Sequence, residues 1–452
     1  MPLALNIATF ALLAWSYAQY HGWRTISPLT IFFLFYCIYA GPQSTYISES
    51  SLLHKFSDNH SSEKLQYLGA ISNSSLTFCP PLHRWLSQKA LTLRSKEAIY
   101  DKVNIAVVTI SAVFAVAFPL ILTAIDPSNI RRVTMSVQAM AGESPFTIQQ
   151  VRRDLFGTTI SSQIIAAIRY YVTGPCLVFL LSWALLRNTQ KTIILTSATI
   201  LFLLGFATTH KQTWLYPVAA MLFWLIFCRQ DSRGGRSPLS DRIFLASSPA
   251  IAVFALTAAY CIQYYSISYP ISYWIDIAYT RIFMQSDTLA VAVEHYGSRD
   301  HFLGLSGMGP VAELFGAERR EPSFEVPLLY NSGNSTTWQN GFLVTGWSIG
   351  GYYGVACVSI LVSAVAATNS ASHYLIRSTF VRIGCAACCS LSLWSLTQMT
   401  FSTALFTGGV AGMVFICAAV WALENRRLVL WRPTTKGGRH LHPQAPPLRR
   451  TR

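Results

Sequence analysis

The apolar residues of this chain fall into repeated blocks of about 20 residues, the length that one helix needs to cross a bilayer core of about 30 Å. The gaps between the blocks hold nearly all the charges. Hydrophobic residues make up 52% of the 452 residues and charged residues only 12%, against about 25% charged in soluble domains. We therefore expect an all-α fold, a polytopic integral membrane protein.

About 11 transmembrane helices are expected, within a range of 10–12. The third is weak, because Asn73 and the prolines Pro80 and Pro81 interrupt it, and re-entrant or interfacial placement is the alternative. The last span is followed by a basic tail, residues 425–452, which we expect to be disordered, so the membrane domain covers residues 1–424. The expected spans are residues 3–21, 28–47, 64–82, 103–125, 162–186, 191–208, 212–228, 243–263, 341–366, 381–400 and 403–424.

The distribution of charge predicts the orientation. If the basic tail is cytoplasmic, the inner loops and tail hold 22 of the 34 Lys and Arg residues but only 5 of the 19 acids. The N-terminus is then outside the membrane, and it is interpreted as a retained span without a cleavable signal. Membrane topology thus explains the net charge of +15, and no nucleic-acid partner is needed.

The cysteines point to packing and not to chemistry. All ten lie within or beside apolar blocks. Cys385 and Cys388 have the spacing of a redox or metal-binding pair, but neither a histidine nor a second cysteine pair accompanies them. The sequence also lacks a phosphate-binding glycine loop and a zinc motif. We expect no disulfide framework, no cofactor and no metal site.

The outer loop at residues 126–161 carries arginines, although basic residues are normally enriched in the cytoplasmic loops of membrane proteins. Arg152 and Arg153 form one of its two basic pairs. Planar guanidinium groups suit a diphosphate ligand. Ion pairs with the acids of the same loop, or contacts with anionic lipid headgroups, are the alternative.

Two further basic positions also depart from the expected enrichment of basic residues on the cytoplasmic side. Arg169 lies inside an apolar run, where a charge pairs, lines a cavity or extends to the interface. His210 and Lys211 form a short outer turn between two spans, where a neutral turn would suffice. His210 could accept a proton or, with Lys211, bind a diphosphate, and a simple solvated hairpin is the alternative.

The large outer loop, residues 266–340, is the main candidate for a functional site, because it is long, polar and aromatic. Apolar residues at helical spacing predict an amphipathic helix on the outer surface within it. The end of the loop places hydroxyl and amide groups beside an aromatic ring, which suits sugar recognition but is also common in ordinary loops. Asp300, Glu318, Arg319, Arg320 and Glu321 are interpreted as a solvated surface run. The candidate residues of the loop are Arg281, Asp287, Glu294, His295, Arg299, Asn334, Trp338 and Asn340.

Several segments resemble a known family. The run Arg281-Ile282-Phe283, then Glu294-His295-Tyr296 and Leu303-Gly304-Leu305-Ser306-Gly307, is similar to the central outer loop of Wzy-type oligosaccharide repeat-unit polymerases. The glycine-rich start of the next span, residues 341–354, and the His210-Lys211 turn also resemble that family. The resemblance covers about 150 residues, from about 205 to 355, and its motifs are loose.

The resemblance implies an enzyme of the bacterial inner membrane, with a periplasmic active site, that joins glycan repeat units carried on undecaprenyl diphosphate. A hydroxyl attacks the anomeric carbon and the lipid diphosphate leaves, without nucleotide or metal. Arg281 would stabilise the leaving diphosphate, assisted by Arg152, Arg153 or Arg169. The base would be His210, Asp287, Glu294 or His295.

The implied partners are the lipid-linked oligosaccharide, membrane lipids and a membrane protein that regulates chain length. An O-antigen ligase, which uses the same donor, and a polysaccharide flippase or transporter remain alternative functions. The near absence of charge within the spans favours chemistry at the outer face over translocation.

Overall fold

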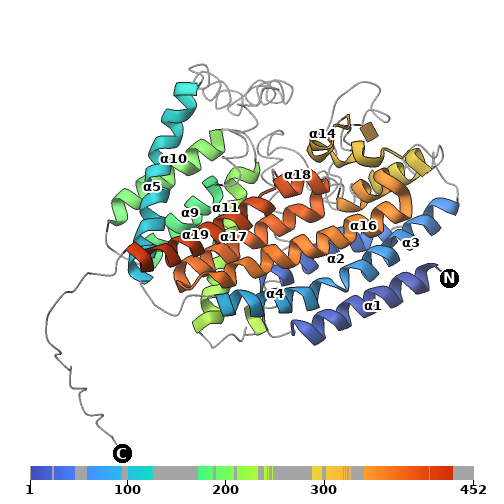
Figure 1. Cartoon of the computed structure of the whole chain (residues 1–452), viewed down its shortest axis with the longest axis horizontal. Helices are drawn as coiled ribbons and strands as arrows, with labels where there is room; N and C mark the ends of the chain where they lie inside the picture. Colours follow the sequence, from blue (N-terminus) through green and yellow to red (C-terminus); the bar gives the residue numbers. More distant parts are fainter. Residues whose placement is uncertain are drawn as a thin grey trace, which may run out of the picture.

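The protein folds into a helical bundle, seen in a computed structural model (Figure 1). No β-strand occurs in the described part of the chain, so the all-α class is confirmed there. The structure describes residues 2–22, 25–45, 59–93, 100–125, 172–186, 190–207, 211–232, 239–241, 288–297, 302–318, 341–406 and 408–430, together with residues 243, 247, 320, 322, 325 and 326.

The helices follow one another along the chain with short turns between many of them. A further helix, called helix 288–297 below, lies between α11 and η3. The elements are α1 (Pro2–Tyr20), α2 (Pro28–Thr45), α3 (Asn59–Leu76), α4 (Cys79–Leu93), α5 (Tyr100–Ile125), α9 (Gly174–Leu186), α10 (Lys191–Ala207), α11 (Lys211–Ser232), η3 (Gly304–Met308), α14 (Pro310–Leu314), α16 (Phe342–Ser372), η4 (His373–Leu375), α17 (Thr379–Gln398), α18 (Phe401–Phe406) and α19 (Val410–Leu430).

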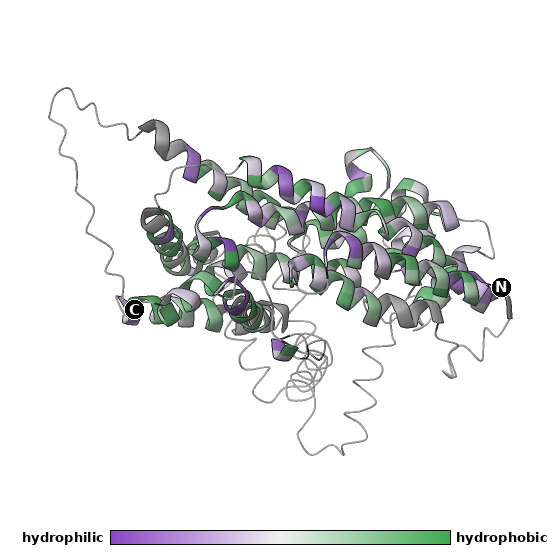
Figure 2. Ribbon diagram, turned by 90° about the horizontal axis from the view of Figure 1, so that it is seen from below, coloured by the Kyte–Doolittle hydropathy of each residue, from purple (hydrophilic) through white to green (hydrophobic). Residues whose placement is uncertain are grey.

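Hydrophobic residues predominate along the helices (Figure 2), and many large apolar side chains of the described residues are exposed. In α5, for example, Val113 and Leu120 are 61% and 66% exposed. Such a surface is typical of a protein that faces lipid. Within the described residues, four helical stretches are long and apolar enough to cross a membrane: Val103–Ile121, Phe342–Leu375, Thr379–Gln398 and Phe401–Asn425. Together these features indicate a membrane protein, and the count of eleven spans stays a prediction.

The third expected span, residues 64–82, is wrong in its bounds. Two helices cover this region, α3 and α4, and the turn between them lies at Thr77 and Phe78. Pro80 and Pro81 fall in the first turn of α4, where the missing proline N–H costs no helical hydrogen bond. The expected last span, residues 403–424, is likewise divided between α18 and α19.

The polar residues that weakened the third span bond to one another inside the bundle. Asn73 accepts a hydrogen bond from the Tyr36 hydroxyl at 2.8 Å and donates one to Asn6 Oδ1 at 2.9 Å. Asn6 in turn donates to Gln66 Oε1 at 2.9 Å. Because every partner is buried, this network joins α1, α2 and α3 where apolar packing alone gives little specificity in lipid.

Hydrogen bonds between helices also fix their relative directions. Ser359 Oγ donates to Ser72 Oγ at 3.4 Å and Ser363 Oγ to the Ser75 carbonyl at 3.2 Å, so α3 and α16 run the same way. Helix α1 runs with them and α2 against them, which agrees with the alternation expected from the charges. We call the end that holds the starts of α3 and α16 the outer end, and the opposite end the inner end (Figure 1).

Within the described residues, three clusters of buried apolar side chains hold the bundle together. The largest joins α1, α2, α3, α16 and helix 288–297, with residues of α17, α18 and α19. A second joins α2, α9, α11, α17 and α19, and a third joins α5, α9 and α10. Helices α2 and α9 each contribute to two clusters, so the packing is continuous from the N-terminal to the C-terminal helices.

The inner end is closed by polar contacts between segments far apart in sequence. Arg382 at the start of α17 forms an ion pair of 2.9 Å with Asp231 at the end of α11. Glu424 in α19 accepts hydrogen bonds from the backbone N–H groups of Arg377 and Ser378, at 3.0 and 3.1 Å, just before α17. A carboxylate at a helix N-terminus is favourable, because it meets unpaired N–H groups and the positive end of the helix dipole.

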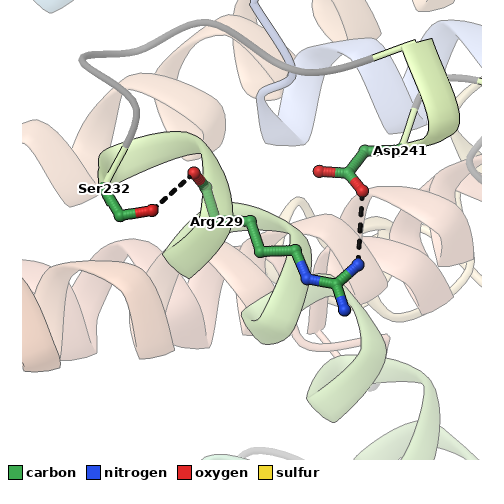
Figure 3. A network of polar contacts seen from close by, with 3 residues as sticks. All are labelled: Arg229, Ser232 and Asp241. Atoms are coloured by element: carbon green, nitrogen blue, oxygen red, sulfur yellow. Dashed lines mark hydrogen bonds and ion pairs between the residues drawn. The ribbon is translucent and has the colours of Figure 1, made fainter.

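A second inner contact involves a buried carboxylate. Arg229 reaches Asp241 Oδ1 at 3.4 Å, while the Ser232 hydroxyl donates to the Arg229 carbonyl at 2.9 Å (Figure 3). The Arg229 side chain is 66% exposed and that of Asp241 only 4%. The segments expected in the cytoplasm thus gather at one end of the molecule.

Candidate active site at the outer end

Helix 288–297 carries two of the candidate residues, Glu294 and His295. Its first six residues, 288–293, are all buried, and residues 289–293 belong to the largest apolar cluster. Over its described part, the helix expected on the outer surface is instead buried at residues 288–293, and the part expected before residue 288 lies outside the described residues. Five consecutive apolar residues, Leu289 to Val293, explain this position, because such a helix has no polar face to expose.

Glu294 and His295 lie near the exit of this buried helix. Both are half-buried, whereas the residues before them are fully buried. The His295 ring meets the Tyr296 ring edge to face, with centroids 4.9 Å apart. A carboxylate and an imidazole at the boundary between the core and the surface are suited to accept a proton from a bound hydroxyl group.

A chain of hydrogen bonds fixes Tyr296 beside them. The Tyr296 hydroxyl donates to Glu325 Oε2 at 3.0 Å, and Arg320 Nε donates to Glu325 Oε1 at 2.6 Å. Burial, followed by the adjacent Glu325 carboxylate, raises the pKa of Tyr296, so the phenol stays protonated and remains a donor. Arg320 is exposed, as expected for a surface charge, and its side chain also holds Glu325 against the buried tyrosine.

The start of α16 is sharply folded. Gly350 has φ −171° and ψ 37°, Gly351 has φ 58° and ψ −134°, and neither pair of angles is helical. A Cβ on Gly354 would lie 2.1 Å from the Gly346 carbonyl oxygen, although residues eight apart in a straight helix are about 12 Å apart. Residues 342–349 therefore turn back against the rest of α16, so the expected span 341–366 is not one straight helix.

The segment Leu303–Gly307 packs against this kink. The Leu303 N–H donates to the Ser348 carbonyl at 2.7 Å, and the Phe302 ring lies against Gly351. The Arg320 N–H donates to the Ser306 carbonyl at 3.0 Å. Two segments that carry the family resemblance, Leu303–Gly307 and residues 341–354, are thus in contact at the outer end.

Of the other candidate residues, Lys211 begins α11, and the rest lie outside the described residues. Their convergence on one outer site stays a prediction. These residues are Arg281, His210, Asp287, Arg152, Arg153, Arg169, Arg299, Asn334, Trp338 and Asn340.

Sequence reasoning missed two groups of residues. Lys64 at the start of α3 and Trp347 at the start of α16 both lie close to Gly297, at the end of helix 288–297. The basic residue just inside the third apolar block was a usable signal, since it stands at the outer end of an expected span. Trp347 had no distinguishing pattern, because aromatic residues are frequent in all the apolar blocks.

The second missed group is a set of imidazoles at the inner end. His21 stacks on Tyr17 at 5.0 Å and on His83 at 5.2 Å between ring centroids. His21 Nε2 also lies 2.6 Å from the Ser27 hydroxyl, and His83 is buried. The two rings therefore pack as aromatic groups inside the bundle.

Comparisons of this chain with protein-family models, with curated proteins and with solved structures found no match.

Proposed function

We propose that this protein polymerises oligosaccharide repeat units carried on undecaprenyl diphosphate, at the periplasmic face of the bacterial inner membrane. One observation carries the proposal: Glu294 and His295 are half-buried near the end of a buried helix, and Gly297 at that end lies against Trp347 in the kinked start of α16. Ionisable groups held at one end of an apolar bundle favour chemistry at the membrane surface.

The reaction needs a base and a group that stabilises negative charge. A sugar hydroxyl on one lipid-linked unit attacks the anomeric carbon of the other, and its proton passes to the base. The bond from the anomeric carbon to the diphosphate oxygen breaks, and the lipid diphosphate leaves with the electron pair. In this proposal Glu294 or His295 accepts the proton, while Arg281 stabilises the leaving diphosphate.

The first test changes Glu294 to Gln, which keeps the shape of the side chain and removes its charge. Loss of a general base lowers the rate about 10²–10⁴-fold. We expect the variant to lose the ladder of long surface polysaccharide on a gel, in the source organism with its own copy deleted, while single-repeat glycan remains on its acceptor. The matched control is Glu318→Gln, an exposed carboxylate at the same end.

The outcomes separate the alternative functions. Loss of the single-repeat band together with the ladder would point to a ligase or a flippase. A normal ladder in Glu294→Gln, with protein levels equal to the control, would remove Glu294 from the mechanism. The same gel with Arg281→Ala tests the leaving-group role, and an unchanged ladder there would contradict it.

A further inference from the structure

Trp347 has a buried indole N–H without a hydrogen-bond partner. The residue is 3% exposed, and its Nε1 finds no acceptor among the residues that the structure describes. Its ring is held between Phe302 and Tyr352 in edge-to-face contacts, with centroids 5.9 and 5.3 Å apart. A buried donor without an acceptor is unfavourable, so the position is one where a ligand atom can supply what the protein does not.

The second donor is the ammonium group of Lys64. A Cβ built on Gly297 would lie 3.0 Å from Trp347 Cζ2, 3.8 Å from Cε2 and 3.9 Å from Lys64 Nζ. Cε2 is the ring carbon bonded to Nε1, and Cζ2 belongs to the benzo ring beside it. The Lys64 ammonium and the Trp347 indole therefore both lie beside Gly297, which has no side chain. Lys64 is half-buried and forms no ion pair with a carboxylate in the described part of the chain.

Both groups can only donate hydrogen bonds, which defines the chemistry of the ligand. An ammonium ion and an N–H beside a residue without a side chain suit an oxygen atom that carries negative charge. Trp347 is itself buried, and a hydrogen bond from a buried N–H to a charged oxygen is stronger than one made in water. A neutral hydroxyl would satisfy the indole but leave the ammonium without a counter-charge.

We propose that Lys64, Trp347 and Gly297 form an oxyanion subsite of the outer end. Resting on the proposed function, this subsite takes an anionic oxygen of the lipid-linked glycan. The source of that oxygen is either the diphosphate or the carboxylate of an acidic sugar. The kink at Gly350 and Gly351 is the feature that turns Trp347 toward helix 288–297.

The test measures binding to the full-length protein in lipid nanodiscs, without any polymerisation. The probes are farnesyl diphosphate, farnesol, inorganic diphosphate and glucuronate, titrated by calorimetry. We expect one or more of the anionic probes to bind and farnesol to bind at least tenfold more weakly. Preference for farnesyl diphosphate assigns the oxygen to the lipid diphosphate, and preference for glucuronate assigns it to an acidic sugar.

Variants then test the two donors separately. Lys64→Met and Trp347→Phe each remove one donor, and each should weaken binding of the preferred anion about tenfold or more. Lys64→Arg, which keeps the charge, should restore binding to within about threefold of the unchanged protein. Lys89→Met, an exposed lysine in α4 toward the inner end, is the matched control and should have no effect.

Two results would overturn the subsite. One is an affinity of Lys64→Met and Trp347→Phe equal to that of the unchanged protein, with all variants monodisperse in detergent. The other is equal binding of farnesol and farnesyl diphosphate. If anion binding depends on Lys64 while Glu294→Gln keeps its polysaccharide ladder, the subsite stands and the role of Glu294 in polymerisation fails.

Discussion

Tyr296 is the residue on which the outer end depends most directly. It is 1% exposed, and its hydroxyl is bonded to a carboxylate that is itself held by Arg320. Replacing it with Phe leaves Glu325 with one partner fewer beside a buried ring. We expect Tyr296→Phe to lower the free energy of unfolding by about 1–3 kcal/mol, measured by thermal unfolding in detergent. Tyr353→Phe, at an 87% exposed position, is the control.

The raised pKa of Tyr296 leads to a second prediction for the same variant, the dependence of stability on pH. Because the pKa of Tyr296 is raised in the folded protein, the stability from its protonated form is complete below the unfolded value of about 10. It is lost as the pH rises above that value. The unchanged protein should therefore lose stability above pH about 10 more steeply than Tyr296→Phe. Parallel curves for the two proteins would argue against a buried, protonated phenol.

Among the individual helices, α16 has the most influence on the structure of the outer end, because its kink turns residues 342–349 back on the rest of the helix. Gly351 has φ 58° and ψ −134°, a backbone conformation that is almost restricted to glycine, and a Cβ there would lie 3.0 Å from the Phe302 ring. We expect Gly351→Ala to lower stability by about 1–3 kcal/mol, which fluorescence-detected size exclusion after heating would reveal. The adjacent Gly350→Ala is the matched control, because that residue is extended and meets open space. Equal losses in the two variants would mean that the kink is not held by Gly351.

Hydropathy predicted most of the helices but not their breaks. The expected spans at residues 3–21, 28–47, 103–125 and 381–400 correspond to α1, α2, α5 and α17 within a few residues. Apolar length identifies such helices well. The turn at Thr77 and the kink at Gly350 depend on partners far along the chain, such as Ser16 and Phe302, which no local pattern reveals.

The candidate site was predictable only in part, for a similar reason. Glu294 was recognisable as an acid in a long outer loop. The burial of the helix that carries Glu294 was not recognisable, because the sequence pattern before this residue fits a surface helix and a core helix equally well. The partners Glu325, Lys64 and Trp347 come from three other segments and meet only through tertiary packing.

The two ends of the molecule carry different polar groups: Glu294 and His295 lie at the outer end, and the ion pairs of Arg229 and Arg382 lie at the inner end. This arrangement predicts opposite accessibility for two exposed positions, Leu305 in η3 and Lys89 in α4. In intact spheroplasts, a membrane-impermeant maleimide should label Leu305→Cys and should label Lys89→Cys only after permeabilisation. The unchanged protein gives the background, since its Cys37 and Cys357 are exposed. Labelling of Lys89→Cys from outside would reverse the proposed orientation.

The fold-back in α16 also adjusts the protein to the thickness of a bilayer. A straight helix of 31 residues would be about 46 Å long, well beyond a hydrocarbon core of about 30 Å. The part after the kink, residues 352–372, is about 32 Å long at about 1.5 Å per residue. By turning back at Gly350 and Gly351, the chain avoids hydrophobic mismatch without tilting α16 steeply. The surplus apolar turns are left at the outer end, where they can hold an aromatic ring against a polar ligand.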